Sequence, residues 1–327
     1  MKEKVLETIK KFNLIENRDI VVAAVSGGPD SIAMLDILIK LQEKMKFKIV
    51  VAHINHMIRE EAISDMEFVK QYCKKYGIDF YSKSIDVQKL ANNNKIGTEE
   101  AGRLVRYQFF DEILEKVGGN KIAIAHNKND RAETIIMNTL RGSGISGLKG
   151  IEAKREKYIR PLIECERAEI ESYCKSNGID ARIDKTNLDN TYTRNKIRNV
   201  VIPYIKKEFN PNIINTLERL SVLVCEEEEY IEKQVEKIYN EILIEESIPN
   251  EIILNLKLFN NQEKVIKSRV VLYTITRLFN SSKGIEKVHI DDVIKLCEKN
   301  IGNKYLTPNK KIKILVKNHK IYFLKQV

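Results

Sequence analysis

The sequence contains no apolar run long enough to cross a bilayer, and its first residues, Met1 to Lys10, are charged and amphipathic rather than typical of a signal peptide. Its 5 cysteines include no pair at C-x-x-C spacing. An odd number without that spacing argues against a disulfide framework and against a structural zinc site. We therefore expect a cytoplasmic protein with no membrane association.

What is present is a chain of 327 residues, of which 43% are hydrophobic and 31% are charged. That length suits two domains, and the composition supports a sizeable core. The formal net charge is +10. A basic excess of this size is compatible with a polyanionic partner and equally with solvated lysine faces, so composition alone does not choose between them.

Apolar runs alternate with helical patterns in the first part of the chain. A strand buried on both faces shows a continuous apolar run, whereas a helix places apolar residues three or four positions apart. The alternation predicts an α/β fold, with a parallel sheet and helices on both faces. The expected strands are residues 20–25, 48–53, 78–84 and 121–125, and the expected helices are residues 5–12, 31–45, 65–76 and 99–117.

The pattern becomes helical after Pro161, and Pro203 and Pro211 bracket a natural boundary. We expect a catalytic domain at residues 1–210 and a smaller, mostly helical domain at residues 211–327. The segment from Lys304 to Lys325 is rich in lysine, and its alternation over residues 311–324 predicts a hairpin. The other elements expected after Pro161 are helices over residues 167–176, 194–207, 213–244, 264–280 and 291–299.

A glycine-rich loop follows the first expected strand and opens a helix. Two glycines let the backbone approach an oxyanion, and the helix start offers free N–H groups and a positive dipole end. Asp30 would repel phosphates unless a cation intervened, so we interpret it as a Mg²⁺ ligand. An ordinary turn with an Asp and Ser cap is the plainer alternative. The loop consists of Ser26, Gly27, Gly28, Pro29, Asp30 and Ser31.

Neither of two other common nucleotide-binding motifs explains this sequence. The loop lacks the Gly-Lys-Ser/Thr end of a Walker A motif. The segment Gly142 to Gly147 fits G-x-G-x-x-G, but an expected helix precedes it where a dinucleotide site needs a strand. We therefore reject a Rossmann site.

Four further motifs accompany the glycine-rich loop. They are HINHMIR at residues 53–59, AGRLVRY at residues 101–107, AHNKNDRAET at residues 125–134 followed by RGSG, and RPL at residues 160–162 with DKTNLDNTYTRNKIR at residues 184–198. The loop resembles the SGGxDS loop of the N-type ATP pyrophosphatases, the PP-loop superfamily. Together the motifs resemble those of the tRNA(Ile)-lysidine synthetase family over roughly residues 19 to 205.

That resemblance implies a reaction. Family members use ATP and Mg²⁺ to adenylate the wobble cytidine of the CAU anticodon of tRNA(Ile). The ε-amine of free L-lysine then attacks carbon 2 and expels AMP, which yields lysidine and changes codon reading from AUG to AUA. The resemblance is also compatible with a homodimer.

The resemblance assigns expected roles to residues of this sequence. Asp130 and Glu133 share one helix face and suit the ammonium of lysine, and either is a candidate base for its proton; helix capping is the plainer alternative. Arg106, with Arg103 as a rival, would hold ATP phosphate or the leaving group. His53 would lie near the nucleotide base. Expected tRNA or phosphate contacts are Arg141, Arg194 and Arg198.

The sequence departs from the family pattern at Arg131, where glutamine is common, and its C-terminal region is short. Three other functions are weighed as alternatives. A PP-loop tRNA thiolase usually needs a catalytic cysteine or an iron–sulfur cluster, and no cysteine lies in these motifs. A small-molecule amidating synthetase would be supported by a glutaminase domain, which is not visible. An RNA-binding protein with a relic nucleotide site is weighed against by Asp30 and the Asp130/Glu133 pair.

Overall fold

The structure is a computed structural model that describes residues 1–55, 57, 62–179, 192–282, 284–299, 304–309 and 311–326. The chain divides into two compact units, Met1–Val224 and Cys225–Val327. This boundary lies inside helix α11 (Ile213–Ile242), later than the expected position at residue 210. The reason is that Ile214 of α11 packs in one cluster with Ala132, so the first turns belong to the N-terminal unit.

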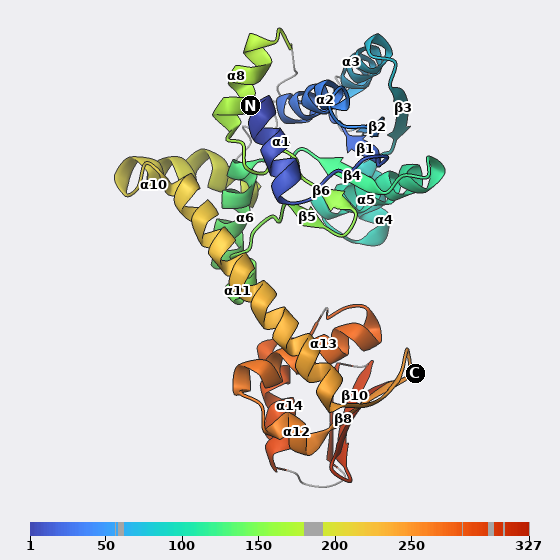
Figure 1. Cartoon of the computed structure of the whole chain (residues 1–327), viewed down its shortest axis with the longest axis vertical. Helices are drawn as coiled ribbons and strands as arrows, with labels where there is room; N and C mark the ends of the chain where they lie inside the picture. Colours follow the sequence, from blue (N-terminus) through green and yellow to red (C-terminus); the bar gives the residue numbers. More distant parts are fainter. Residues whose placement is uncertain are drawn as a thin grey trace. The chain divides into compact units, whose positions relative to one another are not determined.

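The N-terminal unit alternates strands and helices as the sequence predicts (Figure 1). Within the described residues it adds a short helix, α4, and two short strands, β5 and β6, which the sequence analysis did not anticipate. Its strands are β1 (Ile20–Ala24), β2 (Lys48–Asn55), β3 (Asp79–Ser84), β4 (Lys121–Ile124), β5 (Lys154–Arg155) and β6 (Tyr158–Ile159). Its helices before α11 are α1 (Lys2–Lys11), α2 (Pro29–Gln42), α3 (Ala62–Lys75), α4 (Val87–Asn94), α5 (Thr98–Lys116), α6 (Lys128–Leu140), α7 (Gly144–Gly147), α8 (Arg167–Ser176), α9 (Thr193–Lys196) and α10 (Ile202–Glu208), with a π-helical turn (Ile197–Val201) between the last two.

The sheet of this unit has the strand order β3-β2-β1-β4-β6-β5. All neighbouring pairs are parallel except β5 with β6. The chain moves from β1 outward to β3 and then returns to the other side of β1 at β4. The carboxyl ends of β1 and β4 therefore mark the topological switch point, where open α/β sheets bind ligands.

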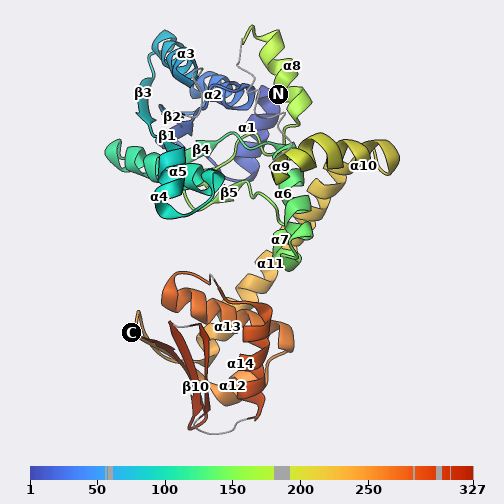
Figure 2. The same ribbon diagram turned by 180° about the vertical axis from the view of Figure 1, so that it is seen from behind.

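Helices cover both faces of this sheet, as expected (Figures 1 and 2). One core joins α1, α2, α3 and α8 to side chains such as Val21 and Val51. The opposite core joins α5, through Phe109 and Phe110, to Val22 and others. Successive residues of β1 thus enter opposite cores, which is why the strand is apolar throughout.

The segment Gly142–Gly147 follows α6 and contains the short helix α7. Helix α6, and not a strand, lies directly before this segment, as the sequence predicts. Within the described residues, no helix is long and apolar enough to span a membrane.

The C-terminal unit contains more strand than the sequence analysis predicts. The expected hairpin is confirmed as β10 (Ile312–Lys317) paired antiparallel with β11 (Lys320–Lys325). It belongs to a five-stranded sheet of order β7-β8-β11-β10-β9, with α12, α13 and α14 packed on the core that the sheet's apolar side chains form. The remaining elements are β7 (Leu243–Ser247), β8 (Glu251–Asn255), β9 (Lys304–Asn309), α12 (Leu256–Asn260), α13 (Lys264–Phe279) and α14 (Lys287–Lys299).

Candidate active site

The loop between β1 and α2 is organised by the hydroxyl of Ser31. Its Oγ accepts hydrogen bonds from the backbone N–H groups of Ser26 at 3.1 Å and Gly27 at 3.2 Å, and donates to the carbonyl of Gly28 at 2.9 Å. Ser31 is 6% exposed, whereas Ser26 is exposed. Both serines belong to the phosphate-binding loop that the sequence predicts. The structure gives Ser31 the role of shaping the loop and leaves Ser26 at its surface.

Gly27 has a backbone conformation that explains its residue type. Its φ is +96°, where a side chain is strained. The helix then begins at Pro29, with Gly28 as its N-cap. Proline suits this first position because its missing N–H would have had no partner inside the helix. The N–H groups of the first turn face the switch point and suit an anion there.

His53 contacts this loop from the neighbouring strand. It is 2% exposed, and its Nδ1 lies 2.8 Å from the carbonyl oxygen of Val25, the residue that leads into the loop. Burial lowers the pKa of His53 and favours the neutral ring. The neutral ring donates from Nδ1 to that carbonyl and so ties the end of β1 to β2. Its predicted contact with the nucleotide base stays a prediction.

Asp130 and Asn127 fix the start of α6 directly after β4. Asn127 accepts from the backbone N–H of Asp130 at 3.0 Å, and Asp130 Oδ2 accepts from the backbone N–H of Asn127 at 3.0 Å. This reciprocal capping box satisfies two helix-end donors and holds the carboxylate in place. The capping alternative for Asp130 is therefore real, but it uses Oδ2 and leaves Oδ1 turned to other partners.

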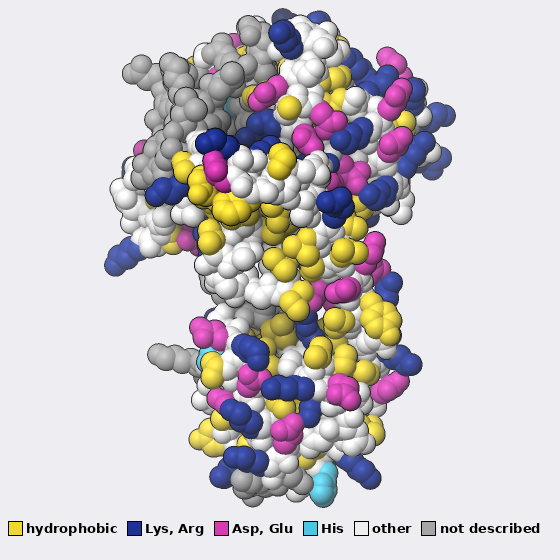
Figure 3. All heavy atoms as spheres, turned by 90° about the vertical axis from the view of Figure 1, so that its left-hand side faces the viewer, with side chains coloured by type: hydrophobic (Ala, Val, Ile, Leu, Met, Phe, Trp, Pro, Cys, Tyr) yellow, Lys and Arg dark blue, Asp and Glu magenta, His cyan; other side chains and the backbone are white. Residues whose placement is uncertain are grey.

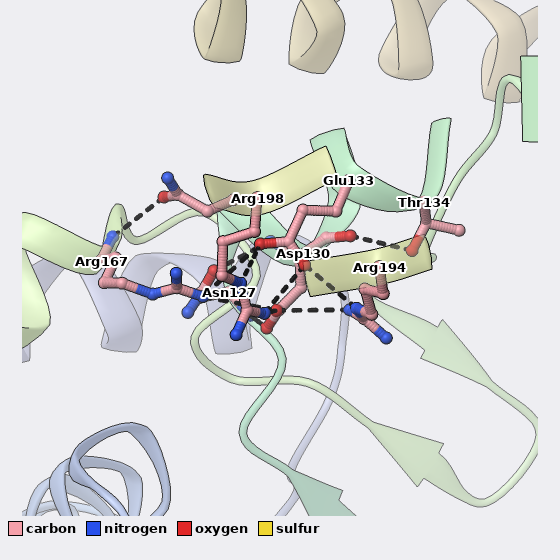
Figure 4. Close-up of polar contacts among 8 residues, drawn as sticks. Asn127, Asp130, Glu133, Thr134, Arg167, Arg194 and Arg198 are labelled. Atoms are coloured by element: carbon pink, nitrogen blue, oxygen red, sulfur yellow. Dashed lines mark hydrogen bonds and ion pairs between the residues drawn. The ribbon is translucent and has the colours of Figure 1, made fainter. Parts of the chain in front are cut away.

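Those partners are arginines, and they also bind Glu133 (Figure 4). Arg194 places Nη2 3.3 Å from Asp130 Oδ1 and Nε 3.0 Å from Glu133 Oε2. Arg198 places Nη2 3.1 Å from Asp130 Oδ1 and Nε 2.6 Å from Glu133 Oε1. Arg167, at the start of α8, lies 3.7 Å from Asp130 and 3.6 Å from Glu133. Both carboxylates are nearly buried, so the cluster is strongly bound together.

The expected roles of these residues thus acquire a complication. The sequence predicts that Asp130 and Glu133 bind a lysine ammonium. It predicts that Arg194 and Arg198 bind phosphates. In the structure the two arginines form ion pairs with the two carboxylates. Burial alone would raise the pKa of Asp130, but Arg194, His126 and the backbone of Asn127 outweigh it and lower the pKa. A lysine ammonium at the predicted position would have to share the carboxylates with these guanidinium groups or displace them.

Asp30 faces this cluster from the other side of the switch point. Burial, followed by the negative charge of Asp130, raises the pKa of Asp30 to about 6. The buried Nδ2 of Asn127 lies close enough to act on Asp30, yet among the described residues it has no hydrogen-bond partner. Two facing carboxylates and an orphaned amide donor fit a site that receives a cation together with phosphate oxygens.

No group of three or more His, Cys, Asp or Glu side chains that could hold a metal ion is found among the described residues. Mg²⁺ commonly binds through one or two carboxylates and completes its shell with substrate phosphates and water. Asp30 therefore fits a magnesium ion that is held jointly with a nucleotide, and not one held by the protein alone.

Arg106, His126 and Arg160 line the same region. Arg106 keeps exposed surface, but desolvation of its guanidinium group, followed by the charges of Arg103 and Arg194, lowers its pKa. Burial, followed by the charges of Arg194, Arg160 and Arg106, lowers the pKa of His126 to about 4, although Asp130 opposes them. The neutral His126 Nδ1 accepts from Nε of Arg160 at 3.3 Å. These electrostatic effects show that Arg106 lies near Arg194 and His126.

The charges around the switch point favour anions. Three carboxylates, Asp30, Asp130 and Glu133, face five guanidinium groups, which leaves an excess of two positive charges. Such an excess over a helix N-terminus suits a triphosphate and an RNA backbone. The five guanidinium groups are Arg106, Arg160, Arg167, Arg194 and Arg198.

One predicted residue lies away from this cluster. Arg141 follows the last residue of α6, Leu140, whereas Asp130 lies in its first turn. At 1.5 Å per residue the two are separated by roughly 16 Å along the helix axis. Of the motif residues, 56, 58 and 59 and the span 184–191 lie outside the described residues.

The sequence analysis missed Arg167, Arg160 and Asn127 as site residues. A signal existed for the first two, because Arg160 opens one of the motifs and Arg167 begins the helix that follows it. Arg167 is set in place because its backbone N–H donates to Asn129 Oδ1 at 3.0 Å. No local pattern reveals that these side chains converge, since they come from different elements.

Arg131, the departure from the family pattern, points away from the two carboxylates. Its Nε donates to the carbonyl of Ile151 at 2.9 Å, and Nη1 lies 4.0 Å from Glu218 of α11. Lys128 of the same helix lies 2.6 Å from Glu218. These contacts fasten α6 to α11, so the substitution changes the support of the site rather than its carboxylate face.

Comparison with known proteins defines the class of protein first. Residues 1–205 match the family model of the PP-loop domain, in agreement with the loop and the sheet described above. The chain is 44% identical over 309 residues to the tRNA(Ile)-lysidine synthase of Caldanaerobacter subterraneus subsp. tengcongensis, covering 94% of this chain and 66% of that protein. It is 46% identical over 308 residues to the same-named protein of Clostridium acetobutylicum, covering 93% and 66%. For the Geobacillus kaustophilus protein the identity is 32% over 321 residues, covering 96% and 68%.

The chain therefore belongs to the tRNA(Ile)-lysidine synthase family, and the resemblance drawn from its motifs is confirmed. It spans about two thirds of the length of these relatives. Among solved structures, the U34-tRNA thiolase NcsA of Methanococcus maripaludis matches with a TM-score of 0.56 at 18% identity, covering 67% of this chain and 77% of that one. At that identity the match confirms the α/β fold.

Proposed function

We propose that this chain ligates free L-lysine to carbon 2 of the wobble cytidine of tRNA(Ile) with a CAU anticodon. The reaction consumes ATP, releases pyrophosphate and AMP, and produces lysidine. The observation that carries the proposal is the pairing of a phosphate loop after β1 with the Asp130/Glu133 carboxylates after β4, at one switch point. Relatives named tRNA(Ile)-lysidine synthase at 44% and 46% identity support the choice of substrate.

The first step forms a bond between the 2-oxygen of cytidine and the α-phosphorus of ATP, and breaks the bond to pyrophosphate. The start of α2 binds the phosphates through the backbone N–H groups of its first turn, and the hydroxyl of Ser31 holds the preceding loop in shape. Asp30 would hold Mg²⁺, which neutralises the pyrophosphate oxygens when bound. Arg106 is proposed to stabilise charge on the phosphates in transfer, because the charge of Arg194 acts on it and so places it within electrostatic range of the cluster.

The second step forms a bond between the ε-nitrogen of lysine and carbon 2, and breaks the bond between carbon 2 and the oxygen that leaves with AMP. The ammonium must lose a proton first, since it has no lone pair. Asp130 and Glu133 are positioned to bind the ammonium and accept that proton. When the ammonium binds these carboxylates, Arg194 and Arg198 are released from them and can pair with a phosphate of the RNA or of AMP.

The C-terminal unit contributes a basic surface for the tRNA in this proposal. On β10 and β11 the lysines Lys313, Lys317 and Lys320 are outside the core formed by Ile314 and its neighbours. The Nζ of Lys313 lies 4.4 Å from the ring centroid of Tyr305 on β9. Lysines beside an exposed aromatic ring suit an RNA backbone. Lys310 belongs to the same lysine-rich segment, Lys304 to Lys325, but lies outside the described residues.

A tRNA thiolase is the main alternative, because NcsA shares the fold. Sulfur transfer by a cysteine requires a reactive thiolate. Burial raises the pKa of Cys73 to about 12 and, as the largest cause, raises those of Cys165 and Cys174 to about 11. These are the cysteines of the N-terminal unit, and they are buried. Their environments favour lysine ligation over sulfur transfer.

The proposal is tested by incubating the purified protein with a CAU-anticodon tRNA(Ile) transcript, ATP, Mg²⁺ and lysine. Digestion and mass analysis should find cytidine converted to a lysine adduct, with AMP formed in equal amount. Replacing the cytidine by uridine is the matched control for the reacting base. AMP formation without an adduct in the presence of lysine would contradict the proposal.

A further inference from the structure

The helical segment that carries Arg194 and Arg198 has a second face that is open to solvent. We call this surface the α10 face and define it by Lys196, Val200, Tyr204, Lys207 and Phe209. Tyr204 is 59% exposed and Phe209 is 74% exposed. The opposite side of the segment buries Ile197 and Ile202 against α6, so the core does not require these aromatic rings.

The two rings of the α10 face form an ordered pair. The centroids of Tyr204 and Phe209 lie 5.9 Å apart at an interplanar angle of 65°. In an edge-to-face pair one ring holds the other in place while flat ring surface remains available. Exposed aromatic faces of this kind are the surfaces on which unpaired nucleic-acid bases stack.

Positive charge surrounds the pair. Between residues 192 and 209 there are five cationic side chains and one acid, Glu208. Two of the five, Arg194 and Arg198, pair with the active-site carboxylates, so the charge nearest the aromatic pair comes from the three lysines. Glu208 pairs with Lys207 at 2.8 Å, but both side chains are exposed and such surface pairs contribute little. Figure 3 shows hydrophobic side chains gathered on this side of the molecule, with Lys and Arg as well as Asp and Glu side chains among them. The cationic residues are Arg194, Lys196, Arg198, Lys206 and Lys207.

The α10 face lies on the same segment as the active-site arginines. Arg198 binds Glu133, and Tyr204 follows six residues later in continuous helix. At 1.5 Å per residue this corresponds to roughly 9 Å along the axis. A ligand that reached both places would have to be an extended polyanion with flat, unpaired bases, which is the chemistry of a single-stranded RNA loop.

We infer that the α10 face is a base-stacking subsite for an unpaired nucleotide of the RNA loop that presents the reacting base. The nucleotide stacks on Tyr204 and Phe209, and Lys196 and Lys207 neutralise the adjoining phosphates. The inference rests on the proposed function, which supplies the RNA. It adds a specific site of contact outside the reacting centre. A second copy of this chain would also cover apolar surface, but the excess of lysine and arginine favours RNA.

The test uses the full chain and an RNA stem-loop with a CAU loop that carries 2-aminopurine at each unpaired position in turn. Stacking on an aromatic ring should quench the fluorescence of one position. The double variant Tyr204→Ala, Phe209→Ala should abolish that quenching and raise the KM for RNA about five- to a hundredfold, the effect of losing one stacked base. The kcat at saturating RNA should stay within about twofold, because no group at the reacting centre changes.

Two controls separate stacking from other effects. Exchange of the rings by Tyr204→Phe with Phe209→Tyr should retain both quenching and KM. Tyr230→Ala, on an aromatic residue that is 65% exposed in α11, should change neither. Sedimentation of the double variant should show the same mass as the parent chain.

Three outcomes would overturn the inference: unchanged quenching in the double variant, no quenching at any position in the parent chain, or a KM effect that tracks conversion of a dimer to a monomer. The binding signal does not require turnover. Quenching that depends on Tyr204 and Phe209 without any AMP formation would support the subsite while refuting the proposed function.

Discussion

Arg198 binds Glu133 at two points, with Nε 2.6 Å from Oε1 and Nη2 2.8 Å from Oε2. Glu133 is 1% exposed, so both of its oxygens are engaged in a site with little water. Two-point pairing of this kind is among the stronger ionic contacts in proteins. The proposed lysine-binding carboxylate of Glu133 is therefore paired with the guanidinium group of Arg198.

Replacement of Glu133 by alanine should affect the two chemical steps unequally. Loss of a charge-assisted contact to the ammonium should raise the KM for lysine roughly ten- to a hundredfold. Adenylation should change less, because the phosphate loop is untouched. The measurement is AMP release without lysine against adduct formation with lysine. Glu218→Gln is the carboxylate control, because Glu218 lies on α11 and contacts Lys128 and Arg131 of α6. Equal losses in both steps would assign Glu133 a structural role.

Asp30 should be essential for pyrophosphate release and unfavourable for stability without ligand. Its folded pKa of about 6 exceeds the unfolded value of 3.8, so the folded chain binds this proton more tightly. Stability is therefore lost as pH rises from about 4 to about 6, by about 3 kcal/mol from this group. Asp30→Asn should unfold at higher urea than the parent at about pH 7 and similarly at about pH 4.

The same variants check the metal role. Asp30→Ala and Asp30→Asn should abolish pyrophosphate release, and Mg²⁺ with ATP should stabilise the parent chain more than either variant. Retained pyrophosphate release would show that Asp30 is not the magnesium ligand. An asparagine variant that is less stable than the parent at about pH 7 would contradict the cause given for the raised pKa.

Arg131→Gln restores the residue common in the family and tests whether Arg131 acts only as support. The buried contacts to Ile151 and Glu218 should be lost at a cost of about 1–3 kcal/mol, since a buried partner is left unsatisfied. That corresponds to a fall in melting temperature of several degrees for a unit of this size. The KM values for ATP and lysine should stay within about threefold at a temperature where the variant is folded. A selective change in KM for lysine would place Arg131 in the site.

The lysine-rich segment from Lys304 to Lys325 predicts a steep dependence of RNA binding on salt. Each phosphate contact that is lost should lower the slope of log affinity against log salt by somewhat less than one. Lys313→Gln, Lys317→Gln and Lys320→Gln should therefore flatten the slope additively. Lys287→Gln and Lys295→Gln, exposed on α14, are the matched controls. An unchanged slope in the triple variant would remove β10 and β11 from the RNA interface.

Much of the N-terminal unit follows from sequence patterns because its strands are apolar throughout and its helices have strong periodicity. The expected strand at residues 20–25 and the helix at 167–176 match β1 and α8 closely. Two strands of the C-terminal sheet lack such a signal, because β9 contains Pro308 and β7 is largely exposed. Strand β8 does have a buried apolar run, at residues 252–254, which the sequence prediction missed.

The candidate site likewise has parts that sequence patterns predict and parts that they do not. The loop from Ser26 to Ser31 and the Asp130/Glu133 spacing are local, and sequence patterns locate them. The contacts of Arg167, Arg194 and Arg198 with those carboxylates join three helices that are far apart in the chain. Helical spacing places Arg194 and Arg198 on one face but does not say which element that face meets. The neutralised carboxylate pair is therefore a result of tertiary packing.

The most direct test follows the masses of RNA and nucleotide together in one reaction of the full chain with a CAU-anticodon tRNA(Ile), ATP, Mg²⁺ and lysine. The account predicts one AMP and one pyrophosphate for each cytidine converted, with the RNA mass raised by one lysine less one water. Conversion of ATP to ADP, or an unaltered cytidine after AMP has formed in the presence of lysine, would contradict it.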